Sequence, residues 1–164
     1  MRRGFTLTEL MMVVTVLAMV TAIIVPMAAD NDASQLRAAA ELLAADIEDI
    51  QARSLANPAE TTCLQTLPEG NGWQLENMAN PGVPILGPDG EPLIRRFGTP
   101  PLAGSSEVLM ATDALPGTGL RFDDQGAPIS LSSKVSFDLG MSDGQTRLRV
   151  EVSASTGRTA IEWP

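Results

Sequence analysis

An uninterrupted apolar run near the beginning of the chain limits what this sequence can be. The run covers 21 residues, Phe5–Val25, and its only charged side chain is Glu9. Because a helix rises about 1.5 Å per residue, the run would span roughly 30 Å, the thickness of the hydrocarbon core of a bilayer. Arg2 and Arg3 precede it, whereas acidic residues follow it. The positive-inside rule therefore predicts a single span with a cytoplasmic N-terminus and the rest of the chain across the membrane.

Three other interpretations of this segment are open. A secretory signal peptide usually has a shorter apolar region of about 7–15 residues, and a cut after Ala29 would place the bulky Met27 three positions before it. A twin-arginine export signal would use Arg2 and Arg3, but Glu9 interrupts the apolar run and no polar stretch follows the arginines. A plain membrane anchor explains the length of the run and leaves Glu9 without a role.

Glu9 is the informative residue, because an acid at the centre of a membrane helix costs about 2.5–3.5 kcal/mol, and less near the interface. Such a residue indicates function and needs a partner. The surrounding sequence, RRGFTLTELMMVV, closely resembles the class III signal of type IV prepilins and type II secretion pseudopilins. In that family a short basic leader ends in glycine and phenylalanine usually follows. A carboxylate comes fifth after the cut, and a proline lies near the end of the apolar helix. Gly4, Phe5, Glu9 and Pro26 occupy these places.

The resemblance implies a processing step and a set of partners. A membrane-embedded prepilin peptidase would cut between Gly4 and Phe5 and methylate the new amine of Phe5. Glu9 would then pair with the Phe5 amine of a neighbouring subunit, since two opposite charges in lipid are tolerated only where they meet. The expected partners are the peptidase, other pilins or pseudopilins in a filament, an inner-membrane assembly platform and membrane lipid.

The resemblance and the residue pattern together divide the chain into a leader peptide at 1–4, a transmembrane and assembly helix at 5–29, and a periplasmic globular domain at 30–164. Pro26 lacks a backbone donor, and the capping groups that begin at Asp30 favour a new helix start. We therefore expect a helix break at Pro26, with a weak or broken junction at 26–33.

A single apolar stripe after this junction predicts an amphipathic helix at about 33–57, which Pro58 would end. Its apolar side chains recur at spacings of 4, 3, 4 and 3 residues: Leu36, Ala40, Leu43, Ile47 and Ile50. This spacing predicts that the helix packs on a sheet, with a coiled-coil seam as the alternative.

Strands are expected over about 61–164, because apolar and polar residues alternate there. The segments concerned are 61–67, 73–76, 120–122, 134–139, 147–152 and 158–163. Six prolines within 81–101 predict an irregular loop, interrupted at most by a short edge strand at 93–97. The predicted fold is α+β and pilin-like, with a long N-terminal hydrophobic helix packed on an antiparallel β-sandwich-like domain. Gly72-Trp73 and the segments LRFDDQG and LRVEVSASTGR further resemble the minor pseudopilin H, or FimT-like, group.

Composition removes most catalytic chemistry. The chain has no histidine and a single cysteine, Cys63, which excludes a Ser-His-Asp triad, a histidine metal site and an intrachain disulfide. We expect no enzymatic activity, no cofactor and no metal. Cys63 is expected to be a buried small hydrophobe, and Trp73 and Trp163 are expected to lie in the core or at its rim.

Two ligand hypotheses are weaker. Asp123 and Asp124 could form a calcium cluster with Asp113 or Asp138, as major pseudopilins often bind calcium in a C-terminal loop. The loop pattern of a calcium site is absent, so a solvated turn is favoured.

Some FimT-like minor pilins bind DNA through a G-R-x-R segment, whereas this chain retains only one of the two arginines, in Gly157-Arg158-Thr159-Ala160. The sequence has 20 acidic and 11 basic residues, a net charge of −9 and a pI near 4.4. Although Arg147, Arg149 and Arg158 could form a local patch, this charge repels a polyanion, and nucleic acid is not an expected partner.

The sequence therefore predicts a minor pseudopilin of a type II secretion-like system, in which it would be a structural subunit of a periplasmic pseudopilus that helps protein export. The alternative is a minor type IV pilin that serves pilus priming, adhesion or DNA uptake. A membrane-anchored periplasmic binding domain is a third possibility. In the first two cases the subunit would be held in the inner membrane and would become part of an envelope filament.

Overall fold

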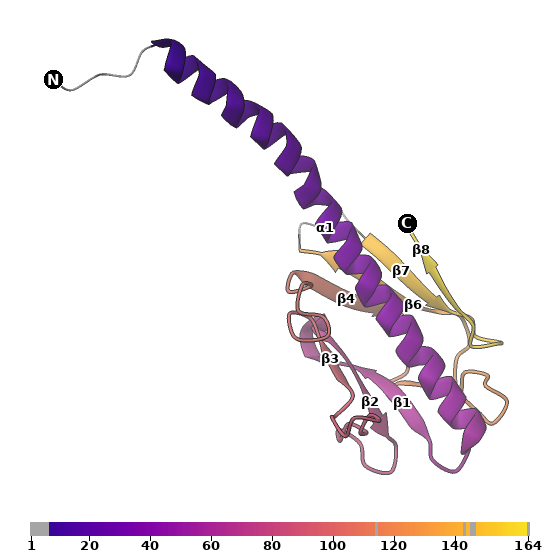
Figure 1. Ribbon diagram of the computed structural model, residues 1–164. Helices are drawn as coiled ribbons and strands as arrows, with labels where there is room; N and C mark the ends of the chain where they lie inside the picture. The colour runs from indigo at the N-terminus through magenta and orange to yellow at the C-terminus, as the bar shows by residue number, and fades with distance from the viewer. Residues whose placement is uncertain (1–6, 114, 143, 145–146, 164) are drawn as a thin grey trace. The chain divides into compact units, whose positions relative to one another are not determined.

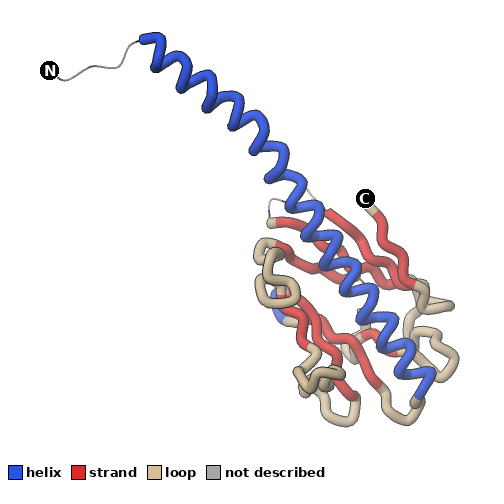
Figure 2. Tube along the Cα trace, viewed as in Figure 1, coloured by secondary structure: helices blue, strands red, loops and turns tan. Residues whose placement is uncertain are grey.

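The computed structural model describes residues 7–113, 115–142, 144 and 147–163, with the side chains of 22–31 outside this description. In this part of the chain a helix precedes two antiparallel sheets (Figure 1), and Figure 2 shows the loops that connect them. The elements are α1 (Leu7–Ala56), β1 (Thr62–Thr66), the short 3-10 helix η1 (Pro68–Gly70), β2 (Gly72–Asn77), β3 (Ile94–Arg96), β4 (Val108–Asp113), β5 (Leu120–Arg121), β6 (Val135–Met141), β7 (Arg147–Val152) and β8 (Thr159–Glu162).

Helix α1 continues through Pro26, which corrects the expected break at this residue and over 26–33. A proline inside a helix removes one backbone hydrogen bond and bends the axis, but long helical segments on both sides can retain it. Compact packing does change along α1, since the chain divides into two compact units between Ser34 and Gln35. The backbone of the residues that follow Pro26 thus belongs to one continuous helix.

The two sheets have the strand orders β3-β2-β1-β5 and β4-β6-β7-β8. All their pairs are antiparallel, which confirms the predicted α+β class. The alternating segments around Phe137 and Val150 become β6 and β7 and pair in register. The short edge strand expected within 93–97 is β3. Strand β4 is an addition that the sequence patterns above do not predict.

The segment of α1 after Gln35 covers both sheets with the predicted apolar stripe. Leu36, Leu43, Ile47 and Ile50 are completely buried and belong to one core cluster that includes side chains of both sheets. Burial of each such side chain contributes about 1.5–3 kcal/mol. The stripe is therefore a surface for packing on sheets, as expected, and not a coiled-coil seam.

A buried polar contact fixes this helix on the first sheet. The Asp46 carboxylate, on α1, accepts a hydrogen bond of 2.8 Å from the Trp73 indole nitrogen on β2 and one of 3.2 Å from Arg95 Nε on β3. Trp73 is fully buried and meets the ring of Phe97 edge to face, with 5.9 Å between ring centroids. Because an indole N–H and a carboxylate are both costly to bury without partners, each satisfies the other.

A second polar contact fixes the helix on two turns, one after β5 of the first sheet and one between β7 and β8 of the second sheet. Gln51 Nε2 donates to the carbonyl oxygens of Gly126 at 2.6 Å and Thr156 at 3.1 Å. The neighbouring Gly157 has φ +68°, and a Cβ there would lie 2.7 Å from the Gly126 oxygen and 2.8 Å from Gln51 Nε2. Only glycine fits both this backbone conformation and this close approach.

Strand β8 differs from expectation in its burial. The sequence pattern predicts that Ile161 faces the core and that Trp163 lies in the core or at its rim, yet they are 38% and 54% exposed. The reason is position, because β8 is the last strand of its sheet. Helix α1 reaches only its beginning, where Thr159 Oγ1 donates to Glu48 at 3.2 Å.

Candidate assembly site

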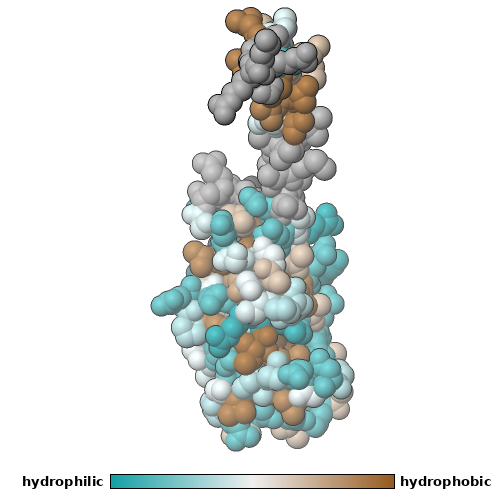
Figure 3. Space-filling view, turned by 60° about the vertical axis from the view of Figure 1, so that its left-hand side comes forward, coloured by the Kyte–Doolittle hydropathy of each residue, from teal (hydrophilic) through white to brown (hydrophobic). Residues whose placement is uncertain are grey.

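The described N-terminal part of α1 is apolar on every side. The five consecutive residues 10–14 are between 52% and 75% exposed. Since successive helical residues are rotated by about 100°, five of them cover the whole circumference. Figure 3 shows apolar side chains gathered on this part of the chain, whereas hydrophilic side chains cover most of the visible surface of the β-domain. A helix that is apolar all round is typical of a membrane segment or of the core of a larger assembly.

Polar side chains within this segment are placed so that they disturb it little. The hydroxyl groups of Thr15 and Thr21 donate to the carbonyls of Met11 and Leu17, each at 2.8 Å. Such bonds to the preceding turn satisfy the hydroxyls within the helix itself, which suits an apolar environment.

Glu9 lies in the first turn of α1 and is exposed. A carboxylate in the first turn is favoured by the helix dipole, which helps the apolar run to accommodate this one charged residue. Glu9 is also the only charged residue between Gly4 and Ala29. Gly4 and Phe5, the predicted cleavage and methylation positions, lie outside the described residues, so the predicted pair of Glu9 with Phe5 stays a prediction.

Within the described residues, no helical stretch combines the length and the apolar character that a bilayer crossing demands.

Two of the four acidic residues considered for calcium, Asp123 and Asp138, already have other partners. Asp123 Oδ1 accepts hydrogen bonds from the backbone of Gln125 at 2.9 Å and Ala127 at 2.7 Å, which closes its own turn. Asp138 lies on β6 and pairs with Arg149 at 2.6 Å. Across the described residues, no group of three or more acidic or cysteine side chains could hold a metal ion.

The arginines considered as a basic patch are interleaved with acids. On the outer face of the second sheet, Asp138, Arg149 and Glu162 are cross-strand neighbours in register. The hydrogen bond that Arg149 donates to Asp138 and the charge of Asp138, and then the charges of Glu151 and Glu162, raise the pKa of Arg149. Along this row the charges therefore alternate in sign.

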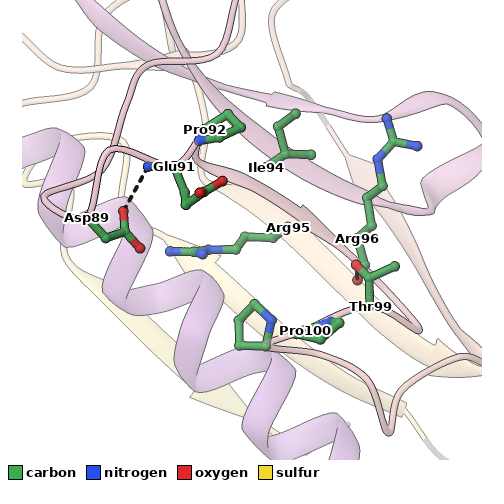
Figure 4. A pocket seen from close by; sticks show the side chains of 9 residues that line it. Asp89, Glu91, Pro92, Ile94, Arg95, Arg96, Thr99 and Pro100 are labelled. Carbon is green, nitrogen blue, oxygen red and sulfur yellow. Dashed lines mark hydrogen bonds between the residues drawn. The ribbon is translucent and has the colours of Figure 1, made fainter.

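Figure 4 shows a shallow pocket of about 550 Å³ beside β3, lined by charged residues and prolines of the proline-rich segment. Arg95 and Arg96 enter it from the strand, and Asp89 and Glu91 from the preceding turn. Its charges are balanced, and the Arg95 guanidinium is already bound to Asp46. The pocket has neither a nucleophile paired with a base nor a convergent set of acceptors, so it offers no catalytic arrangement.

Cys63 is buried on the outer side of the first sheet, as expected, but it has a polar neighbour. Its Sγ lies 3.7 Å from Glu76 Oε1, and Glu76 Oε2 accepts a bond of 2.6 Å from the backbone nitrogen of Gly82 in the proline-rich loop. Burial, followed by the charge and hydrogen bond of Glu76, raises the pKa of the Cys63 thiol from 9.0 to about 12. The thiol is therefore held neutral and unreactive.

We expect Cys63 to make stability fall at alkaline pH. The folded-state pKa is raised, so this contribution is complete below pH 9 and is lost as the pH rises from 9 toward 12, where only the unfolded chain releases the proton. Urea unfolding of the wild type and of Cys63→Ala between pH 8 and 11 measures this effect. The wild type should lose stability more steeply than the variant, and parallel curves would contradict the assignment. At pH 8 a disulfide reagent should react only in urea.

Comparisons with known proteins found matches to the N-terminal segment and to the fold. Residues 1–25 match the model of the prokaryotic N-terminal methylation motif. No curated protein matches the sequence.

Among solved structures, the chain is similar to the type IV minor pilin FimU of Pseudomonas aeruginosa. In one crystal form of FimU the identity is 18% and the TM-score 0.51, with 79% of this chain and 89% of FimU covered. In another crystal form the identity is 20% and the TM-score 0.50, with coverages of 77% and 92%.

The chain is likewise similar to the minor pseudopilin EpsH from the type 2 secretion system of Vibrio cholerae. Here the identity is 7% and the TM-score 0.51, with 79% of this chain and 98% of EpsH covered.

The fold is thus that of pilins and pseudopilins, with the helix packed on antiparallel sheets. The N-terminal motif and this fold together support the type IV pilin and pseudopilin class that the sequence predicts. The similar structures include both a pilin and a pseudopilin, and neither is FimT, so the FimT-like assignment stays a prediction.

Proposed function

We propose that the protein is a non-enzymatic structural subunit of an envelope filament, specifically a minor pseudopilin of a type II secretion-like system. The carrying observation is the helix segment around Glu9, which is apolar on every side and exposes its side chains in the isolated chain. Assembly would bury this surface against equivalent helices of neighbouring subunits. At about 25 cal/mol per Å² of apolar surface, such burial is a strong driving force.

Processing would prepare this surface for assembly. The prepilin peptidase would remove residues 1–4 and methylate Phe5, so that a new amine is available to pair with Glu9 of a neighbour. Before assembly, Phe5–Val25 would hold the subunit in the inner membrane with the β-domain in the periplasm. The charge distribution around the apolar run supports this orientation.

A minor type IV pilin is the second candidate, and it has its own support. FimU shares 18–20% of aligned residues with the chain, whereas EpsH shares 7%. Deletion of the gene, followed by complementation, separates the two functions. Loss of protein secretion with normal pili supports the pseudopilin, and loss of pili or pilus-dependent DNA uptake with normal secretion supports the pilin.

Replacing Gly4 by leucine should leave the precursor uncut and still inserted in the membrane. Glycine has no side chain to exclude from the cut site, whereas leucine would occupy it and leave the apolar run intact. Mass spectrometry of the N-terminus, after membrane fractionation, measures both results. Arg3→Lys is the matched control, because it preserves the leader charge and the junction. A mature N-terminus at Phe5 in the leucine variant would contradict the proposed cleavage.

A further inference from the structure

Strand β8 leaves one edge of the second sheet open. It pairs with β7 alone, and Figure 1 shows it at the end of the sheet. The backbone nitrogen of Ser153 donates to the Arg158 oxygen, so Arg158 directs its backbone groups toward β7. In an antiparallel pair this direction alternates from one residue to the next, and the backbone groups of Thr159 and Ile161 therefore point away from β7. Among the described residues, these outward groups have no hydrogen-bond partner.

Each of the other three sheet edges is partly covered by a neighbouring segment. Beyond β3, the Arg96 carbonyl accepts a hydrogen bond from the following turn. Beyond β5, Ile129 donates to the Arg121 carbonyl at 2.9 Å. Beyond β4, Gly70 of η1 lies against the Met110 carbonyl. Proteins generally protect such edges because unpaired strands invite a further strand, and among the described residues β8 lacks even a partial contact of this kind.

The side chains of β8 also lack cover on the inner face of the sheet. Phe137, Val150 and Ile161 form one cross-strand row, in which the first two are fully buried and Ile161 is 38% exposed. Trp163, two residues further along the same face, is 54% exposed. One more strand beside β8 would continue this row and cover both side chains.

The outer face of the sheet specifies the charge of such a strand. Asp138, Arg149 and Glu162 follow one another across three strands, with signs that alternate. Arg149 already binds Asp138 through two hydrogen bonds, at 2.6 and 3.2 Å. Arg149, the cross-strand neighbour of Glu162, is thus already neutralised by Asp138. On the other side of Glu162, beyond the edge of the sheet, a lysine or arginine of an added strand would be stabilised.

We propose that β8 binds an extended strand of another protein, in antiparallel orientation, whose apolar residues alternate with lysine or arginine. The apolar residues would cover Ile161 and Trp163, and a basic residue would pair with Glu162. The backbone groups of Thr159 and Ile161 would supply the hydrogen bonds of this strand addition.

A second copy of this chain fits the edge less well. Antiparallel self-pairing of β8 needs a twofold axis perpendicular to the sheet, which would reverse the direction of the α1 segment 35–56 in the second copy. Subunits anchored in one membrane need these segments to run the same way, and this step alone rests on the proposed function.

Synthetic nine-residue peptides test the proposal on the full chain in detergent micelles. Because Trp73 is fully buried and Trp163 is not, acrylamide quenching reports chiefly on Trp163. A peptide that alternates valine and lysine should bind and shield Trp163 from acrylamide. A peptide that alternates valine and glutamate should bind about tenfold more weakly, and Glu162→Lys should reverse this preference.

Backbone methylation separates strand addition from simple adhesion. In an antiparallel pair, the valines opposite Ile161 direct their N–H groups toward β8, and the lysines direct theirs away. N-methylation at the valines should therefore abolish binding, whereas N-methylation at the lysines should preserve it. These peptides leave the protein unchanged, so no result depends on whether a variant folds.

Three outcomes would overturn the proposal. They are equal binding of the two methylated peptides, equal binding of the lysine and glutamate peptides, and no protection of Trp163. Light scattering measures the oligomeric state of the protein without peptide and so tests whether a second copy occupies the edge. A dimer that dissociates when Ile161 is replaced by proline would assign the edge to a second copy. None of these measurements involves cleavage or filament assembly, so they fail or succeed independently of the proposed function.

Discussion

Replacing Glu9 by leucine is expected to weaken association of the processed subunit with its filament partners by roughly a hundredfold to several thousandfold. The carboxylate is the only acid of the apolar segment. If it pairs as proposed with the methylated amine of a neighbour's Phe5, its removal would leave that amine in an apolar environment without a counter-charge. Loss of one member of a buried pair costs roughly 3–5 kcal/mol. At about 1.4 kcal/mol for each tenfold change, this corresponds to the expected loss.

Membrane insertion should respond in the opposite direction. An acid in a membrane helix opposes insertion, so leucine should preserve or strengthen anchoring. Cleavage should be nearly unaffected, because the cut lies about one helical turn from residue 9. The variant is therefore expected to be anchored and processed but deficient in assembly, which separates the role of Glu9 from that of Gly4.

Crosslinking and co-purification of the processed variant with other filament subunits measure the defect. Met12→Leu is the matched control, because this exposed residue lies in the same apolar segment and carries no charge. Glu9→Asp keeps the charge and should retain part of the association. If processed Glu9→Leu joins the complex at wild-type levels, the charge-pair account of Glu9 is wrong. A subunit at the filament tip has one neighbour fewer, so its defect would be smaller.

The fold was predictable wherever a residue pattern has one physical meaning. The stripe that includes Leu43 and Ile47 could be buried only by packing on another element, and both are fully buried. The alternation around Phe137 and Val150 likewise requires one face against the core, and these strands pair in register. Glu9 was conspicuous because its charge is unfavourable everywhere in its apolar surroundings, and the family model matches the segment that contains it.

The errors arose where tertiary context decides. Pro26 has a strong local preference, yet the helix continues through it. Alternation predicts an inner face for Ile161 but cannot say whether anything covers that face, and at a sheet edge little does. Sequence reasoning also missed Asp46, because a lone acid inside a helix has no pattern that identifies a partner 27 residues away. Only the paired geometry of helix and sheet reveals this contact.

Asp46→Ala is expected to lower the free energy of unfolding by about 3 kcal/mol. The substitution leaves the Trp73 indole N–H buried without an acceptor, which costs about 1–3 kcal/mol. It also separates Arg95 from its counter-charge, and breaking a buried pair costs roughly 3–5 kcal/mol. The Arg95 side chain retains 21% exposure, so water would recover part of this second cost. For a chain of this size the melting temperature should fall by roughly 6–12 °C.

Asp49→Ala provides the control within the same helix. Asp49 pairs with Arg53 at 2.8 Å, but both side chains are more than one third exposed, so the loss should be no more than about 0.5 kcal/mol. Asp46→Asn should lie between the two, because its amide oxygen can still accept from Trp73 but no longer neutralises Arg95. Urea unfolding followed by near-UV circular dichroism measures all three variants. If Asp46→Ala were as stable as Asp49→Ala, the contacts of Asp46 with Trp73 and Arg95 would contribute no more to stability than an exposed ion pair. Apolar packing alone would then hold the helix on the first sheet. Neither substitution should alter cleavage at Gly4, since that site is far along the chain from the contact that each one removes.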